Sequence, residues 1–83
     1  MLPEAGFNLF PNPANSTITI NSEDITNGLP VNVSVLNCNG KLVMERKYRN
    51  LPVQIDISPL ATGIYLLRIE TANAVETMKL VKI

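Results

Sequence analysis

Short runs in which apolar and polar residues alternate are the feature that most restricts the fold of this 83-residue chain. In residues 17–21, Ile18 and Ile20 would face a core while the threonines face water. Residues with turn chemistry interrupt the alternation roughly every 8 to 12 residues, and no segment of about ten residues has helical periodicity. The runs expected to form strands are residues 7–10, 17–21, 31–35, 41–44 continuing toward 50, 53–57, 64–70 and 75–83. About seven such strands predict an all-β fold, an immunoglobulin-like antiparallel sandwich of two sheets.

The stretch from residue 56 to residue 65 predicts a corner between two strands. Ser58 would cap a one-turn helix over residues 58–62, and Pro59 would supply the fixed φ that suits its first position. Gly63 would then end this helix with a positive φ, a conformation that glycine adopts without steric cost. The corner is expected to be structural, because these turn residues present no reactive group.

Two side chains of the corner are expected to pack inward. Leu60 would cover it, and Tyr65 would open the next strand with a buried ring whose hydroxyl needs a hydrogen-bond partner. With the alternating positions they predict a core of Ile18, Ile20, Val33, Val35, Val53, Ile55, Ile57, Leu60, Tyr65, Leu67 and Ile69.

The segment Asn37-Cys38-Asn39-Gly40 predicts the clearest hairpin of the chain, with Gly40 at a position of positive φ. Cys38 lies at the hairpin tip and, as the single cysteine, forms no intramolecular disulfide. A further turn is expected at Asn27-Gly28, in a loop rich in polar residues, glycine and proline.

Composition argues against catalytic and nucleic-acid-binding functions. The chain has no histidine, so zinc-type coordination and Ser-His or Cys-His nucleophile pairs are not expected. Seven basic and seven acidic residues cancel, which removes the positive field of a general nucleic-acid binder. The longest apolar runs reach about four residues, far below the roughly 20 that span a bilayer. We therefore expect no enzymatic activity, no cofactor, no metal site, no nucleic-acid partner and no small-molecule substrate.

Two charged clusters have alternative interpretations. Glu23 and Asp24 are adjacent, but a calcium site would need more oxygen ligands at regular spacing than this loop supplies. Residues 46–49 form a basic cluster around Tyr48 that either contacts anions or keeps a strand edge charged and free of unwanted pairing. We favour the charged strand edge.

Four short segments occur in order along the chain: Phe10-Pro11-Asn12-Pro13 before Ile18-Thr19-Ile20, then Val35-Leu36-Asn37 with Gly40-Lys41, then Ile57-Ser58-Pro59-Leu60 before Gly63-Ile64-Tyr65, and finally Lys79-Leu80-Val81-Lys82. In this combination the chain resembles the C-terminal sorting domain of the type IX secretion system, type A, from Phe7 to Ile83. The resemblance implies that the structural motif residues are Pro11, Asn12, Pro13, Gly40, Leu60, Gly63 and Tyr65. Asn37 departs from the family pattern, in which aspartate is common at that turn, and Cys38 is unusual beside it. Asparagine also tolerates the turn geometry.

The resemblance implies a secretion signal. In that family the cargo enters the periplasm by an N-terminal signal, and an outer-membrane translocon recognises the terminal sandwich. A sortase-like peptidase commonly removes this domain and joins the cargo to a surface glycolipid. The chain is thus expected to contain a linker at residues 1–6 and a monomeric sorting domain at residues 7–83. The expected locations are the periplasm in transit and then the outer membrane, the cell surface or the medium.

The last strand, residues 75–83, is the expected site of recognition by the translocon. If it lies on a sheet edge, it offers unpaired main-chain groups to a partner strand, and Lys79 and Lys82 would guard against wrong pairing. The candidate recognition residues are therefore Lys79, Leu80, Val81 and Lys82.

A second hypothesis is a fibronectin-like or immunoglobulin-like accessory domain that spaces or binds for a neighbouring module. Leu60 and Tyr65, on either side of Gly63, are similar to the tyrosine corner of such sandwiches. Fold alone does not separate the two functions. Position in the parent gene does, because a sorting domain must come last.

Overall fold

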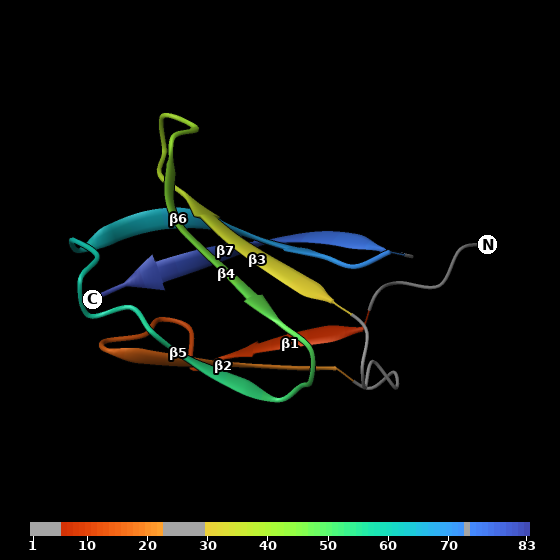
Figure 1. Ribbon diagram of the computed structural model, residues 1–83. Coiled ribbons are helices and arrows are strands. Elements are labelled where there is room, and N and C mark those ends of the chain that lie inside the picture. Colours follow the sequence, from red (N-terminus) through yellow and green to blue (C-terminus); the bar gives the residue numbers. More distant parts are fainter. Residues whose placement is uncertain (1–5, 23–29, 73) are drawn as a thin grey trace.

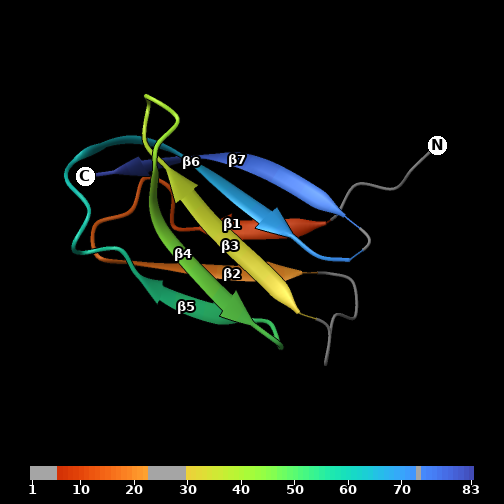
Figure 2. The same cartoon turned by 45° about the horizontal axis from the view of Figure 1, so that its top comes forward.

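The computed structural model describes residues 6–22, 30–72 and 74–83. These ranges contain seven strands: β1 Phe7–Phe10, β2 Thr17–Ser22, β3 Val31–Leu36, β4 Leu42–Tyr48, β5 Val53–Asp56, β6 Gly63–Glu70 and β7 Val75–Lys82. All neighbouring strands pair antiparallel, in the orders β1-β2-β5 and β4-β3-β6-β7. The two sheets stack face to face (Figures 1 and 2). The predicted two-sheet antiparallel sandwich is confirmed.

The core forms where the alternating side chains of the two sheets meet. Nine of the eleven predicted core residues are buried, and the other two, Val53 and Leu60, are partly buried and pack against them. The sequence analysis left out five further buried hydrophobic residues: Phe7, Ala14, Val31, Met44 and Leu80. Four of these lie in strands whose inward face the alternation already implied, whereas Ala14 lies in a loop.

The hairpin between β3 and β4 has the predicted geometry. Gly40 has a φ of 82°, and its N–H donates to the Asn37 carbonyl at 2.9 Å. The Asn37 side-chain oxygen accepts hydrogen bonds from the main-chain N–H groups of Asn39 at 2.9 Å and Lys41 at 3.0 Å. Asparagine therefore holds this turn with the same acceptor geometry that aspartate would offer. Cys38 is exposed at the tip.

The corner between β5 and β6 differs from the prediction. The Leu60 N–H donates to the Ile57 carbonyl at 2.9 Å, which closes a single reverse turn in place of a one-turn helix. The cap also comes from a different residue, because the Asp56 carboxylate accepts the Ser58 N–H at 2.9 Å. An aspartate that bonds the N–H two residues on is a standard turn device, and it makes the helical cap by Ser58 unnecessary.

The prediction that Gly63 has a positive φ is wrong. Among the described glycines, only Gly6 and Gly40 have positive φ. Because the turn has already ended, Gly63 is the first residue of β6 and pairs with Lys82 in an extended conformation. A Cβ atom at Gly63 would meet the Tyr65 ring at 4.0 Å, an ordinary van der Waals contact.

Tyr65 behaves as the sequence predicts. Its ring is buried, and its hydroxyl donates to the Ala61 carbonyl at 2.6 Å. This bond fastens the strand to the turn that precedes it, as in the tyrosine corner of immunoglobulin-like sandwiches. The predicted Asn27-Gly28 turn and the Glu23-Asp24 pair lie outside the described residues.

Candidate functional site

The four motif segments gather at one end of the sandwich, which we call the motif end and define by residues 11–16, 37–41, 57–63 and 79–83. In Figure 1 the chain end of β7 lies there beside the corner before β6 and the loop between β1 and β2, with the β3–β4 hairpin above them. The Ile57 N–H donates to the Ser16 carbonyl at 2.8 Å, which ties the corner to that loop. Two motif segments that are distant in sequence are thus bonded to each other at this end.

Asn12 joins the first motif segment to the last. Its side-chain amide donates to the Lys79 carbonyl at 2.7 Å, and its side-chain oxygen accepts the Val81 N–H at 2.9 Å. One amide group therefore donates and accepts along the edge of β7, as a peptide group of a neighbouring strand would. Pro11 and Pro13 flank Asn12, and each ring fixes its own φ, which restricts the backbone that carries this amide.

Ala14 continues the same attachment with its backbone. Its N–H donates to the Val81 carbonyl and its carbonyl accepts the Ile83 N–H, both at 2.8 Å. These bonds form a parallel bridge to Lys82, and the Ala14 side chain is only 1% exposed. Asn12 and Ala14 thus close the edge of β7 from Lys79 to Ile83.

The four predicted recognition residues alternate between the two faces of β7. Leu80 is 0% exposed and Lys82 is 8% exposed, so both point into the sandwich. The Lys82 ammonium donates to the Ile83 main-chain oxygen at 3.0 Å. Lys79 is exposed and Val81 is partly exposed on the opposite face. The expectation that Lys82 is an exposed guard of the edge is therefore wrong, whereas Lys79 has the expected exposure.

The first half of β7 has a different edge. β7 is an edge strand of the four-stranded sheet, which is the condition that the sequence analysis set for recognition by a partner strand. Since Val81 and Ile83 direct their main-chain groups away from β6, strand alternation places those of Val75 and Thr77 on the same side. No strand or side chain among the described residues pairs with Val75 or Thr77 on that side. This open half of β7, residues 75–79, adjoins the half that Asn12 closes.

The outer face of the four-stranded sheet is apolar near the motif end. Cross-strand pairing aligns Leu42, Leu36 and Leu66 in one row, which ends at Lys79 on β7. Ile64 and Val81 form the next pair toward the chain end. Leu42, Ile64 and Leu66 are exposed, and a solvent-facing apolar group of this kind marks a surface for contact with another protein. The apolar residues on both faces of residues 64–67 are the sequence signal that indicates this surface.

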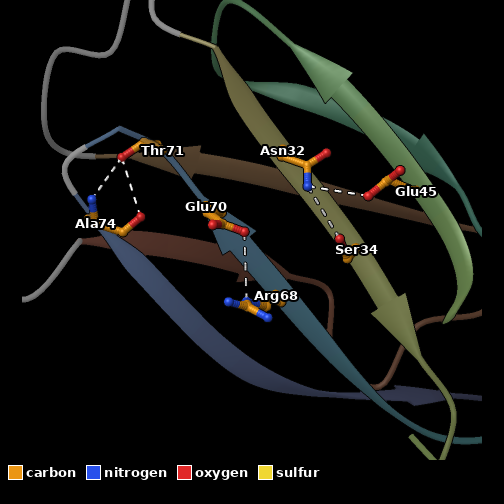
Figure 3. Close-up of polar contacts among 7 residues, drawn as sticks. All are labelled: Asn32, Ser34, Glu45, Arg68, Glu70, Thr71 and Ala74. Carbon is orange, nitrogen blue, oxygen red and sulfur yellow. Dashed lines mark hydrogen bonds and ion pairs between the residues drawn. The ribbon is translucent and has the colours of Figure 1, made fainter. Parts of the chain in front are cut away.

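Polar side chains of β3, β4 and β6 occupy the part of the outer face beyond the apolar row (Figure 3). Arg68 and Glu70 approach to 3.9 Å, and the Asn32 amide lies 3.4 Å from the Glu45 carboxylate. Near these side chains is an open hollow of about 450 Å³, lined by Pro30, Val31, Asn32, Lys47, Glu70, Thr71 and Ala72. It lies away from the motif end and contains none of the motif residues.

The described residues contain no group of three or more His, Cys, Asp or Glu side chains that could hold a metal ion. In the same residues, no helix is long and apolar enough to cross a membrane. Arg46 and Lys47 of the basic cluster lie on β4, the opposite edge strand of the same sheet, where the Arg46 guanidinium donates to the Glu45 carbonyl at 2.8 Å. At the corner, hydrogen bonds from the Ser58 hydroxyl and from its N–H hold the pKa of the fully exposed Asp56 below its ordinary value.

Comparison with known protein families identifies the chain. A family model described as the secretion system C-terminal sorting domain matches residues 8–83. The chain belongs to this family. As a type IX secretion sorting domain, it is a signal for export across the outer membrane to the cell surface or the medium, and it interacts with the type IX secretion machinery. The family is not a catalytic one. No curated protein matches the chain.

The sorting domain therefore has all four of its motif segments at one end. Three of them present side chains on the apolar outer surface, namely Leu36, Ile64 and Val81. The remaining segment contributes Asn12, which holds the edge of β7. The sequence analysis named Asn12 and Val81 in separate motif segments, but it did not show that they are bonded, because their contact spans 69 positions of the chain.

Proposed function

We propose that this domain carries a cargo protein through the periplasm to an outer-membrane translocon that recognises the motif end. After passage, a sortase-like peptidase removes residues 7–83 together with part of the linker at residues 1–6, and the cargo is attached to the cell surface. The observation that supports this proposal is the pair of hydrogen bonds that Asn12 forms with Lys79 and Val81, which joins the first motif segment to the last.

The recognition residues in this proposal act in two ways. Lys79 and Val81 face outward and contact the translocon directly, beside the apolar row that contains Leu66. Leu80 and Lys82 point inward and hold the strand in place. A rigid strand end favours recognition, since less conformational entropy is lost on binding. The domain acts as a monomer, with its apolar outer surface reserved for the machinery.

The domain boundary also supports removal as a unit. Phe7 is the first residue of β1 and is buried in the core. A cut on the N-terminal side of Phe7 leaves both sheets whole, so the released domain stays folded.

The test is a fusion of the domain to the C-terminus of a carrier protein that has its own signal for export to the periplasm. In a bacterium with a type IX system, the fusion should reach the cell surface or the medium, while the carrier alone stays in the periplasm. Lys79→Glu should lower delivery, and Lys47→Glu, which changes an exposed lysine of β4 outside the motif end, serves as the matched control. If the intact fusion stays in the periplasm, the accessory-domain hypothesis replaces this proposal.

The details of attachment have a separate readout. Surface-delivered carrier should have lost the domain, and mass spectrometry of its new C-terminus should find a bond to a glycolipid group. Carrier that reaches the surface with residues 7–83 still attached would contradict the proposed removal while leaving the sorting function in place.

A further inference from the structure

We propose that the open half of β7, residues 75–79, receives an extended segment of the secretion machinery as an added β-strand. The inference rests on the proposed function and extends the contact with the machinery from the motif end along the adjoining part of β7. It locates the contact on main-chain groups of Val75 and Thr77 in addition to the exposed side chains of Lys79 and Val81.

The main-chain geometry provides the first argument. In β7 the even-numbered residues direct their N–H and C=O groups toward β6, and the odd-numbered residues direct theirs away from it. Asn12 and Ala14 use the outward groups from the Lys79 carbonyl to Ile83. The N–H and C=O groups of Val75 and Thr77 and the N–H of Lys79 remain for a partner. An added strand satisfies such groups with regular hydrogen bonds, which is the basis of peptide recognition by strand addition.

The other edge strands are less suited to this contact. β1 and β5 have four residues each, whereas β7 has eight. The edge strand β4 carries Glu45, Arg46 and Lys47 in succession, and its register with β3 shifts between Val35 and Leu36. Charge and irregular register both disfavour an added strand. The open half of β7 has a regular register along its whole pairing with β6.

The edge of β7 already accepts a strand-like segment within this protein. Residues 12–14 lie along its second half and pair in the parallel direction through Ala14 and Lys82. A partner segment on residues 75–79 would lie in line with residues 12–14 and meet Asn12 at its end. Asn12 thus limits how far the partner strand extends and fixes its register.

The side chains beside the open half define the chemistry of the partner. Val75, Thr77 and Lys79 point to the outer face, and Lys79 continues the apolar row through Leu66. No ion pair involves Lys79 among the residues that the structure describes. We therefore infer an extended segment with an apolar or β-branched residue opposite Val75 and an acidic residue opposite Lys79, since opposite charges across a strand pair are favourable.

The test replaces outward N–H groups by proline in the carrier fusion. Thr77→Pro removes one donor and places a ring against the incoming strand, whereas the bonds to β6 do not use this N–H. Delivery to the cell surface should fall by about tenfold or more, as expected when main-chain hydrogen bonds and strand contact are lost. Thr77→Ala keeps the N–H and should deliver within about twofold of the unchanged domain.

Gln54→Pro is the matched control on the other sheet. The Ile57 N–H donates toward β2, so alternation directs the Gln54 N–H away from β2, at the free edge of β5. This variant carries the same chemical change on an edge strand that should not receive the partner, and its delivery should stay within about twofold of the unchanged domain.

Folding is checked in each variant by thermal unfolding of the isolated fusion. If Thr77→Pro does not fold, Val75→Pro takes its place, because the first residue of a strand tolerates proline and the Val75 N–H also points outward. A folded proline variant at either position that is delivered at the unchanged rate would overturn the inference.

The outcomes separate this inference from the proposed function. If the unchanged fusion is never exported, the proposed function fails. If it is exported and the folded proline variants are exported equally well, only the added strand fails. The competing occupant of this edge is a second copy of the chain, and sedimentation tests for it. A dimer of the unchanged domain that becomes a monomer in Thr77→Pro would show that the edge pairs with a second copy.

Discussion

The two halves of β7 differ in what lies along their outer edge. From Lys79 to Ile83 the outward main-chain groups bond to Asn12 and Ala14, which come from a loop near the start of the chain. Across Val75 and Thr77 the same strand has no neighbour on that side within the described residues. Both halves pair with β6 in one continuous register. The difference therefore comes from the far edge alone.

The burial of side chains follows the same division. On the inward face, Leu80 and Lys82 in the closed half are buried, whereas Glu76 and Met78 in the open half are partly exposed. Both halves share the pairing with β6, and the closed half adds a fully buried side chain and hydrogen bonds along its outer edge. The closed half of β7 thus stabilises the fold, while the open half has an edge available to a partner.

Side-chain truncation should show the largest contrast between the halves. Leu80→Ala should lower the free energy of unfolding by about 2 to 5 kcal/mol, because it leaves a cavity in the core. Val75→Thr keeps the β-branched shape at an exposed position and should change it by no more than about 0.5 kcal/mol. Chemical denaturation of both variants measures the contrast. Similar losses in the two would mean that the open half is as well packed as the closed half.

Removal of the Asn12 amide should weaken the closed half alone. Asn12→Ala breaks two hydrogen bonds and should lower the free energy of unfolding by about 1 to 3 kcal/mol. Native-state hydrogen exchange should show faster exchange at the Val81 N–H. Asn15→Ala, an exposed asparagine of the same loop, is the control and should stay within about 0.5 kcal/mol of the unchanged domain. Unchanged protection of Val81 in Asn12→Ala would contradict the assignment of the closure to Asn12.

Two glycines test whether backbone conformation also holds the motif end. Gly40 has a φ of 82°, so Gly40→Ala should lower the free energy of unfolding by about 1 to 2 kcal/mol. Gly63 pairs with Lys82 in an extended strand with room for a Cβ atom, so Gly63→Ala should change it by no more than about 0.5 kcal/mol. Thermal or chemical unfolding of both variants gives the comparison. A larger loss of unfolding free energy in Gly63→Ala would mean that the backbone conformation of Gly63 also stabilises the motif end.

The sequence predicted what alternation and turn chemistry determine. The inward positions of β2, β3 and β6 follow a period of two residues, and the hairpin at Asn37 and Gly40 follows the local preference of those residues for turns. These signals are local, so residues a few positions apart are sufficient to interpret them. The tyrosine hydroxyl bond was predictable for the same reason, since Ala61 lies four positions before Tyr65.

The sequence did not predict what depends on distant contacts or on competition between turns. Asn12 meets Lys79 and Val81 only after both sheets have formed, and no local pattern encodes that contact. The predicted positive φ of Gly63 was wrong because Asp56 stabilises a shorter turn, which ends before residue 63. Lys82 was expected to guard the strand edge against wrong pairing, but the two-residue period of β7 directs its side chain inward. Lys82 can point inward although it is charged, because its long side chain lets the ammonium reach the Ile83 main-chain oxygen.

The smallest expected effect concerns pH and lies at the corner beside the closed half. Hydrogen bonds from the Ser58 hydroxyl and N–H lower the pKa of Asp56 below its ordinary value of 3.8. Because the folded pKa is depressed, the contribution of Asp56 to stability is present above that value and is lost as the pH falls through the folded pKa. NMR titration of the Asp56 carboxyl group should give a midpoint below 3.8.

Ser58→Ala removes the hydroxyl and should move the midpoint of the Asp56 titration upward, toward the ordinary value. A midpoint that does not move would show that the hydroxyl does not hold the carboxylate, and a midpoint at or above 3.8 in the unchanged domain would show that the corner is not closed by Asp56.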